Sequence, residues 1–128
     1  MPLFDTSARR DKCRHLLGIA DLDSVCNAVA SGVDTMDSSY PTKLARHGTL
    51  LTKEGLLRIK RGRHAKSFGV KIDADCRCST CAHYDRAYLC HLFKAKEHVA
   101  LQLASAHNLH FMNQYMSNLR KDILNGLL

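Results

Sequence analysis

The chain has 128 residues, of which 45% are hydrophobic and 24% are charged, enough for one buried core beneath a water-facing surface. No stretch approaches the roughly 18 consecutive apolar residues of a membrane span. Residues 1–14 also lack the apolar core of a signal peptide, so we expect a cytoplasmic protein with no membrane partner. Lys and Arg outnumber Asp and Glu by 19 to 12, and the net charge of +7 favours a polyanionic partner, although many basic proteins bind no nucleic acid.

Residues 14–38 are predicted to form one strand–helix–strand unit. The apolar run at 14–20 indicates a short strand, apolar residues from Leu22 to Val29 recur at helical spacing, and residues 33–38 indicate a second strand. This is the unit of a parallel α/β sheet or barrel, whose strands need cover on both faces. We therefore expect the chain to be either a fragment of a larger α/β protein or a subunit that pairs with another.

Residues 49–60 have the pattern of an antiparallel hairpin. A turn at 53–55 joins two runs, and the second run alternates apolar and basic side chains. Two interpretations stay open for the cations there: a solvated edge strand whose charges deter aggregation, or an edge that contacts phosphate groups. The cations concerned are Arg58, Lys60, Arg61, Arg63, His64 and Lys66.

Two helices are predicted in the last third of the chain. The first covers residues 85–93, and a longer one runs from about 96 to 124 and ends near Asn125 and Gly126. The apolar residues of the longer helix recur at spacings of three, four or sums of these, which predicts one continuous core stripe. Its members are Val99, Leu103, Leu109, Met112, Met116, Leu119 and Ile123.

Three of the cysteines are too close together for ordinary core use: Cys76, Cys78 and Cys81. A Cys-x-Cys-x-x-Cys turn lets three thiolates converge on one tetrahedral Zn²⁺, which then needs one further ligand. The remaining cysteines are interpreted as small buried apolar residues. They are Cys13, Cys26 and Cys90.

The fourth ligand is sought among the histidines that follow the cysteines. His107 lies one helical turn after Leu103, beside the predicted stripe, and is our first choice because it would point inward from a rigid element. His110 is the alternative if the helix is rotated, and a buried His107 without metal is a third interpretation. Three thiolates and one imidazole would close the coordination sphere, so the Zn²⁺ would be structural.

Asp34 and Asp37 are predicted at the carboxyl end of the second strand. In α/β barrels this end carries the active site, and a carboxylate there can serve as nucleophile, acid–base group or ribose ligand. The Asp-x-x-Asp pattern alone also suits helix caps and solvated turns. The pattern therefore leaves catalysis open beside a purely structural role.

Taken together, these segments resemble the tRNA-guanine transglycosylases. Residues 32–48 resemble the segment that ends the last barrel strand of this family, and residues 14–18 are similar to the preceding strand. The three-cysteine motif, followed by residues 86–89 and 107–109, resembles the zinc subdomain of the family, with the same spacing from cysteine to histidine. The resemblance runs from about residue 9 to residue 124.

The resemblance implies an enzyme that exchanges the wobble guanine of certain tRNA anticodons for a 7-deazaguanine, preQ1 or queuine, in queuosine modification. Asp37 occupies the position of the nucleophile, which attacks the ribose C1′ and forms a covalent intermediate. Leu17 and Gly18 fall where the strand borders the base, and Lys43 and Arg46 match positions that hold the anticodon loop. The resemblance also implies that Zn²⁺ takes no part in the reaction; its implied ligands are Cys76, Cys78, Cys81 and His107.

The resemblance covers the C-terminal third of the family's chain and implies an α/β fold. Residues 1–48 would form the last strand–helix–strand unit of a (β/α)₈ TIM barrel, and residues 49–128 an inserted antiparallel hairpin with a helical zinc-binding subdomain. The second catalytic Asp would lie upstream, so we expect the chain alone to be inactive. Because family enzymes are dimers, we expect a homodimer or pairing with the missing barrel part. The alternative function is a non-catalytic, zinc-dependent tRNA-binding or dimerisation module, or an accessory subunit.

Overall fold

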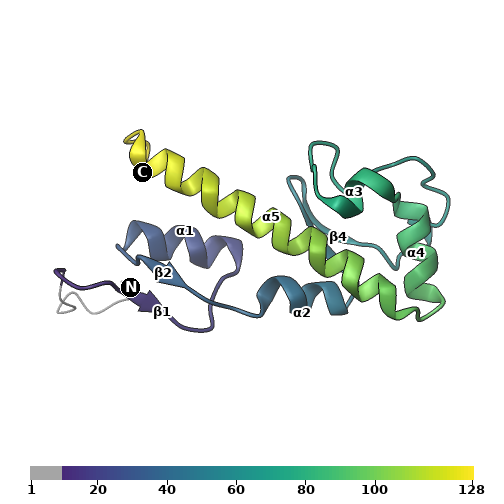
Figure 1. The fold of residues 1–128 in the computed structure, drawn as a ribbon, viewed down its shortest axis with the longest axis horizontal. Coiled ribbons are helices and arrows are strands. Elements are labelled where there is room, and N and C mark those ends of the chain that lie inside the picture. Colours follow the sequence, from purple (N-terminus) through teal and green to yellow (C-terminus); the bar gives the residue numbers. More distant parts are fainter. Residues whose placement is uncertain (1–9) are drawn as a thin grey trace. The chain divides into compact units, whose positions relative to one another are not determined.

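The computed structural model describes residues 10–128, so the first nine residues of the predicted N-terminal unit lie outside the described residues. The fold is mixed α/β, with two small sheets and several helices (Figure 1). Contacts divide the chain into a first compact unit that ends at Tyr40 and a second that covers Pro41–Leu127. The division of the intact protein at residue 48 stays a prediction.

The first unit contains the predicted strand–helix–strand. Strand β1 (His15–Leu16) pairs in parallel with β2 (Thr35–Met36), and helix α1 (Leu22–Ala30) connects them. Asp21 caps α1 by accepting a 3.0 Å hydrogen bond from the backbone nitrogen of Ser24, which satisfies an amide that the first turn leaves free. The unit is confirmed, although each strand pairs over only two residues and is shorter than predicted.

Arg14 and Asp34 fix the entry into the two strands. The Asp34 side chain accepts a 2.8 Å hydrogen bond from the backbone nitrogen of Arg14. Gly32 has a φ of +87°, a conformation that favours glycine, and the guanidinium of Arg14 packs against it. Asp34 therefore stands before β2 and ties it to β1, whereas Asp37 directly follows β2.

A helix that was not predicted, α2 (Tyr40–Arg46), joins the two units along the chain. Pro41 lies in its first turn, where a missing amide hydrogen costs nothing. Lys43 and Arg46 lie in its last turn, where cations interact favourably with the free carbonyls.

The predicted antiparallel hairpin follows. Strand β3 (Thr49–Thr52) pairs with β4 (Gly55–Arg58), with Thr49 opposite Arg58 and Thr52 opposite Gly55. Leu57 and Ile59 are buried while Arg58 and Lys60 are exposed, as the alternation predicted. A short 3₁₀ helix, η1 (Gly62–His64), comes next, and its His64 is buried although the pattern grouped it with the exposed cations.

Three helices complete the second unit: α3 (Ser79–His83), α4 (Arg86–Lys94) and α5 (His98–Leu124). The first was not predicted, while α4 and α5 agree with the predicted ranges to within two residues. Asp85 caps α4 by accepting a 2.8 Å hydrogen bond from the backbone nitrogen of Tyr88. Among the described residues, no helix combines the length and the apolar character that a membrane crossing requires.

The core of the second unit lies between the hairpin, α3, α4 and one face of α5, and the predicted stripe on α5 is partly wrong. Val99, Leu109 and Ile123 are exposed by 39%, 45% and 48%. The inward face keeps Met112 and Leu119 of the predicted stripe and otherwise carries small and polar residues. Alanine lets neighbouring backbone approach closely, and the polar side chains bond to β3. The buried residues of α5 are Ala100, Ala104, His107, Asn108, Met112 and Leu119.

The prediction that the three other cysteines are buried is right for one of them and wrong for two. Cys90 is fully buried, as predicted, and its thiol donates a 3.8 Å hydrogen bond to the carbonyl oxygen of Arg61. Cys13 and Cys26 are exposed, so their interpretation as core residues was wrong. Both belong to the small first unit, where Val25 and Ala28 are the buried residues of α1.

Candidate metal centre and strand-end site

The four predicted zinc ligands lie together in the second unit. The sulfur atoms of the three cysteines and Nδ1 of His107 all lie within 4.8 Å of one another. The Sγ atoms of Cys76, Cys78 and Cys81 are 3.7, 3.5 and 3.4 Å from that nitrogen. Zn–S and Zn–N bonds of about 2.3 and 2.0 Å at tetrahedral angles place S and N ligands about 3.5 Å apart. The donor set and its spacing therefore fit a closed structural zinc site, and the predicted cluster is confirmed.

The orientation of the His107 ring is fixed from the side away from the sulfurs. Its Nε2 donates a 2.7 Å hydrogen bond to the carbonyl oxygen of Leu51 in β3. The proton therefore belongs on Nε2, and Nδ1 presents its lone pair to the three sulfurs. Metal-binding histidines usually have such a partner, which sets both tautomer and ring direction.

Burial shapes the electrostatics of the cluster. It raises the pKa of the Cys76 thiol to about 12, although the amide of Cys78 lowers it, and it raises the pKa of Cys81. Burial also lowers the pKa of His107, so the imidazole is neutral at pH 7. Thiolates at this position need a cation beside them, and a divalent metal ion supplies that charge.

The loop that carries the cysteines is anchored on both sides. The buried Asp73 accepts a 3.0 Å hydrogen bond from the backbone nitrogen of Lys53, and the amide of Cys76 bonds to the Asp73 carbonyl. The buried Thr80 hydroxyl donates a 2.7 Å hydrogen bond to the carbonyl of Leu103 on α5. The sulfur atoms are thus held by two elements besides their own turn.

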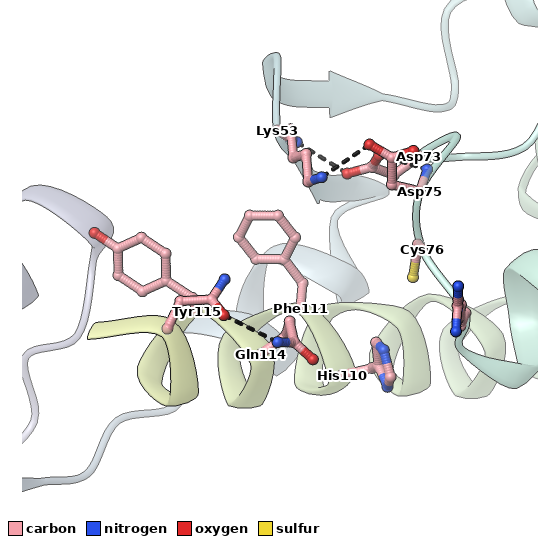
Figure 2. A pocket seen from close by; sticks show the side chains of 10 residues that line it. Lys53, Asp73, Asp75, Cys76, His110, Phe111, Gln114 and Tyr115 are labelled. Atoms are coloured by element: carbon pink, nitrogen blue, oxygen red, sulfur yellow. Dashed lines mark hydrogen bonds and ion pairs between the residues drawn. The ribbon is translucent and has the colours of Figure 1, made fainter. Parts of the chain in front are cut away.

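A groove of about 500 Å³ lies beside the centre. Figure 2 shows it between the segment with Asp73, Asp75 and Cys76 and the face of α5 that carries Phe111 and Tyr115. Among the four ligands only Cys76 lines it, and Cys76 is also the one that is not fully buried. The centre therefore has one side toward solvent and three sides in the core.

The other candidate histidines lie outside the cluster. His110 lines the groove, one turn along α5, and is no member of the group of ligand atoms. His83 is exposed and its Nδ1 donates a 2.9 Å hydrogen bond to the carbonyl of Ser79. His91 and His98 are exposed. Between His107 and His110, the geometry therefore selects His107 as the fourth member of the cluster.

The second site lies at the end of the parallel strand pair in the first unit. Asp37 follows β2 directly, its amide bonds to the carbonyl of Leu16, and its side chain is 63% exposed. The parallel register pairs Leu16 with Met36, so the next residue on β1, Leu17, comes beside Asp37. Leu17 is 74% exposed, and Gly18 turns the chain with a φ of +72°.

Sequence reasoning assigned no role to His15 in this site. His15 Nε2 lies 3.0 Å from Oδ1 of Asp37, and its Nδ1 lies 2.8 Å from the hydroxyl of Thr35. The pairing of His15 with Thr35 across the parallel strands brings these side chains together. No signal in the sequence indicated this contact, because the predicted strands over 14–20 and 33–38 did not determine the register that pairs His15 with Thr35.

Asn108 is a second residue that was missed. It is fully buried next to His107, and its Oδ1 accepts a 2.9 Å hydrogen bond from the amide of Leu51. Its Nδ2 donates to the carbonyls of Pro41 and Thr49 at 2.9 and 3.0 Å. An amide beside the ligand histidine on the same helix was the signal available.

Exposed cations surround a groove of about 440 Å³ in the second unit, and no acidic side chain lines it. Lys60 is oriented there by packing against Gly48 and by lying 5.7 Å over the ring of Phe93. Helix α2, with the exposed Lys43 and Arg46, leads directly into this segment. The residues that line the groove are His47, Gly48, Thr49, Arg58, Lys60 and Arg61.

Comparison with known proteins gives one consistent result. A queuine tRNA-ribosyltransferase of Protochlamydia amoebophila is 50% identical over 118 residues, which cover 92% of this chain and 30% of that protein. Those of Chlamydia caviae and Lysinibacillus sphaericus are 44% and 42% identical, over 98% and 88% of this chain and 34% and 29% of theirs. The chain thus spans about a third of the length of the curated relatives it matches.

The match extends over both sites described above. The sequence model of one family, queuine tRNA-ribosyltransferase, covers residues 4–128, and so includes Asp37 as well as the Cys₃His cluster. From these matches, the chain belongs to the queuine tRNA-ribosyltransferase family.

Proposed function

We propose that the chain is the C-terminal part of a tRNA-guanine transglycosylase and that Asp37 is its nucleophile. The intact enzyme would exchange the wobble guanine of a tRNA for a 7-deazaguanine, preQ1 or queuine. The single observation that supports this most is the position of Asp37: exposed, directly after a parallel strand, beside the exposed Leu17. Ligand sites of α/β folds lie at this end of the strands.

The reaction proceeds by two displacements at one carbon. An oxygen of Asp37 forms a bond to the ribose C1′ as the bond from C1′ to N9 of guanine breaks, and guanine leaves with that electron pair and takes up a proton. N9 of the incoming base then gives up its proton to solvent, forms a bond to C1′ and releases the carboxylate as the bond from Asp37 to C1′ breaks. Two inversions retain the configuration at C1′. Leu17 and Gly18 border the base in this proposal, and the nucleotide must be turned out of its stack to present C1′.

Asp34 is a poorer candidate for the nucleophile. Its side chain bonds to the amide of Arg14 before β2 begins, which is a structural task. In the intact enzyme, Asp37→Asn should abolish guanine exchange and the covalent RNA adduct, while Asp34→Asn should keep the adduct. An adduct that persists in Asp37→Asn would assign the nucleophile elsewhere.

We propose a structural role for Zn²⁺. Four protein ligands leave no open position for water or substrate, so the ion would hold the cysteine loop against α5 and β3. The chain's residues near the ion would then do no chemistry on the RNA.

The groove lined by cations is proposed to contact the RNA backbone, together with Lys43 and Arg46 at the anticodon loop. Its support is the uniform charge of its lining and the preset orientation of Lys60. In the intact enzyme, the double variant Arg58→Glu, Lys60→Glu should weaken binding of an anticodon stem-loop and reduce the slope of log K against log salt by about 1 per lost phosphate contact. Arg120→Glu, an exposed reversal near the end of α5, is the control.

The second candidate function is a non-catalytic, zinc-dependent tRNA-binding or dimerisation module. One observation favours it: the metal centre and the cation-lined groove both lie within the second unit, without residues of the first. A guanine-exchange assay on this chain, alone and with a full-length partner, separates the two. Exchange only in the intact enzyme supports the first proposal, and a dimer on light scattering would support the proposed homodimer. Either role belongs in the cytoplasm, where we propose the protein acts on tRNA.

A further inference from the structure

The carboxylate of Asp37 is held on one side by the ring of His15. Its Oδ1 lies 3.0 Å from Nε2 of His15, while its Oδ2 has no hydrogen-bond partner in the part of the chain that the structure describes. A carboxylate only accepts hydrogen bonds, so Nε2 carries the proton of this contact. One oxygen of Asp37 is thereby held, and the other stays available.

A second contact sets the state of the imidazole. His15 Nδ1 lies 2.8 Å from the hydroxyl of Thr35, which stands opposite His15 in the strand pair. In the neutral ring Nδ1 has a lone pair, so the Thr35 hydroxyl donates to it and favours the tautomer with the proton on Nε2. In the charged ring the same hydroxyl accepts instead, so the chain of contacts persists in both states.

We propose that His15 is a positioning residue for Asp37, oriented by Thr35, and this rests on the proposed function. The imidazole fixes the carboxylate by Oδ1 so that Oδ2 is aimed at the ribose C1′. The side chains of His15 and Asp37 are 42% and 63% exposed, so without this contact the carboxylate would rotate among several rotamers in water. The entropy cost of fixing one rotamer of Asp37 is therefore met in the free enzyme, before the substrate binds.

The kinetic test uses the intact enzyme and compares two substitutions at position 15 with two at position 35, opposite it. His15→Ala should lower kcat by about 10- to 100-fold through loss of orientation, with KM for the RNA changed by less than about threefold. His15→Gln should restore most of the rate, because its side-chain amide can donate to Oδ1 from a similar reach. Thr35→Val should give a smaller loss, which Thr35→Ser reverses. His98→Ala, exposed at the start of α5, is the control histidine.

A spectroscopic test reports on the contact without turnover. In the intact enzyme labelled with ¹⁵N-histidine, His15 should show the shifts of the tautomer protonated at Nε2 when neutral, and Thr35→Val should remove that preference. Zinc content and circular dichroism identify variants that fail to fold. A mixed tautomer in the wild type, or a His15→Ala enzyme with the wild-type kcat while Asp37→Asn is inactive, would overturn the role of His15 alone. Guanine exchange in Asp37→Asn would overturn the proposed function and this role with it.

Discussion

His107 donates a 2.7 Å hydrogen bond from Nε2 to the carbonyl oxygen of Leu51, a residue 56 positions earlier in the chain. The neighbouring Asn108 accepts from the amide of the same Leu51. Both polar groups of one residue in β3 are therefore bound by adjacent side chains of α5. The ligand histidine is thus fixed to the hairpin as well as to the helix, so metal binding and packing of the hairpin are coupled.

Replacing His107 should release the metal, whereas replacing His110 should not. His107→Ala removes one of four ligands, and we expect zinc affinity to fall by more than about 100-fold, beyond the effect of losing an outer partner. His110→Ala leaves the cluster intact. Metal analysis of both purified variants checks this, and stoichiometric zinc in His107→Ala would contradict the ligand assignment.

Cys78→Ser should unfold much of the second unit. Structural Zn²⁺ supplies on the order of 10 kcal/mol of folding free energy, and we expect residues 70–124 to lose protection when it is gone. Hydrogen exchange followed by mass spectrometry measures this region directly.

Cys90→Ser is the matched control, because Cys90 is also buried but lies outside the cluster. It should keep its zinc and its protection in 70–124. Equal loss in both variants would mean that burial, and not the metal, makes these cysteines important.

Asn108→Ala should destabilise the second unit by about 3 kcal/mol, because it leaves buried polar groups of β3 without partners. Asn113→Ala, an exposed change on the same helix, should alter the free energy of unfolding by less than about 0.5 kcal/mol. Urea unfolding of the zinc-loaded protein measures both. Similar values for the two variants would show that the Asn108 hydrogen bonds contribute little.

Asp85 should make the free energy of unfolding depend on pH. Hydrogen bonds from the amides of Gly69 and Tyr88 lower the pKa of its carboxyl group, which has an unfolded value of about 3.9. Since the folded pKa is the lower one, the stabilisation is complete above the unfolded pKa and is lost as the pH falls through the folded pKa. The amide proton shifts of Gly69 and Tyr88 should therefore titrate with a midpoint below about 3.9.

The stabilisation that Asp85 provides at neutral pH can be measured by substitution. Asp85→Ala should lower the free energy of unfolding by about 1 kcal/mol, as for other helix caps. Asp122→Ala, in the last turn of α5, removes a carboxylate from the unfavourable end of a helix and should cost nothing. A midpoint at or above the unfolded pKa, or equal costs for the two variants, would contradict the assignment.

The sequence predicted the elements that have strong local signals. The spacing of Cys76, Cys78 and Cys81 identified the metal centre, because few structures other than a metal site bring three thiols so close. The helix predicted from about 96 to 124 followed from the spacing of its apolar residues, and the hairpin from the alternation in 56–60. Helix α2 was missed because Tyr40–Arg46 is too short to show a helical period of apolar residues.

The orientation of α5 and the site around Asp37 depended on distant partners. Large apolar residues predicted an inward face with Val99 and Leu109, yet the buried face includes His107 and Asn108. Their partners are backbone atoms of β3, more than 50 positions away. The spacing of apolar residues along a helix cannot predict hydrogen bonds to such distant partners. The contact of His15 with Asp37 depends in the same way on strand register, which residue spacing alone did not determine.

The bonds from α5 to β3 have one more consequence. A strand with unpaired amides and carbonyls invites another chain to add to it, and in β3 the outward groups of Thr49 and Leu51 are already taken by side chains of the helix. Stripping the metal would free His107 to turn and would leave the carbonyl of Leu51 without its partner, while Asn108 keeps its bonds to the strand. We therefore expect zinc-depleted protein to associate more readily through β3, so that a bound ion would also guard against misassembly.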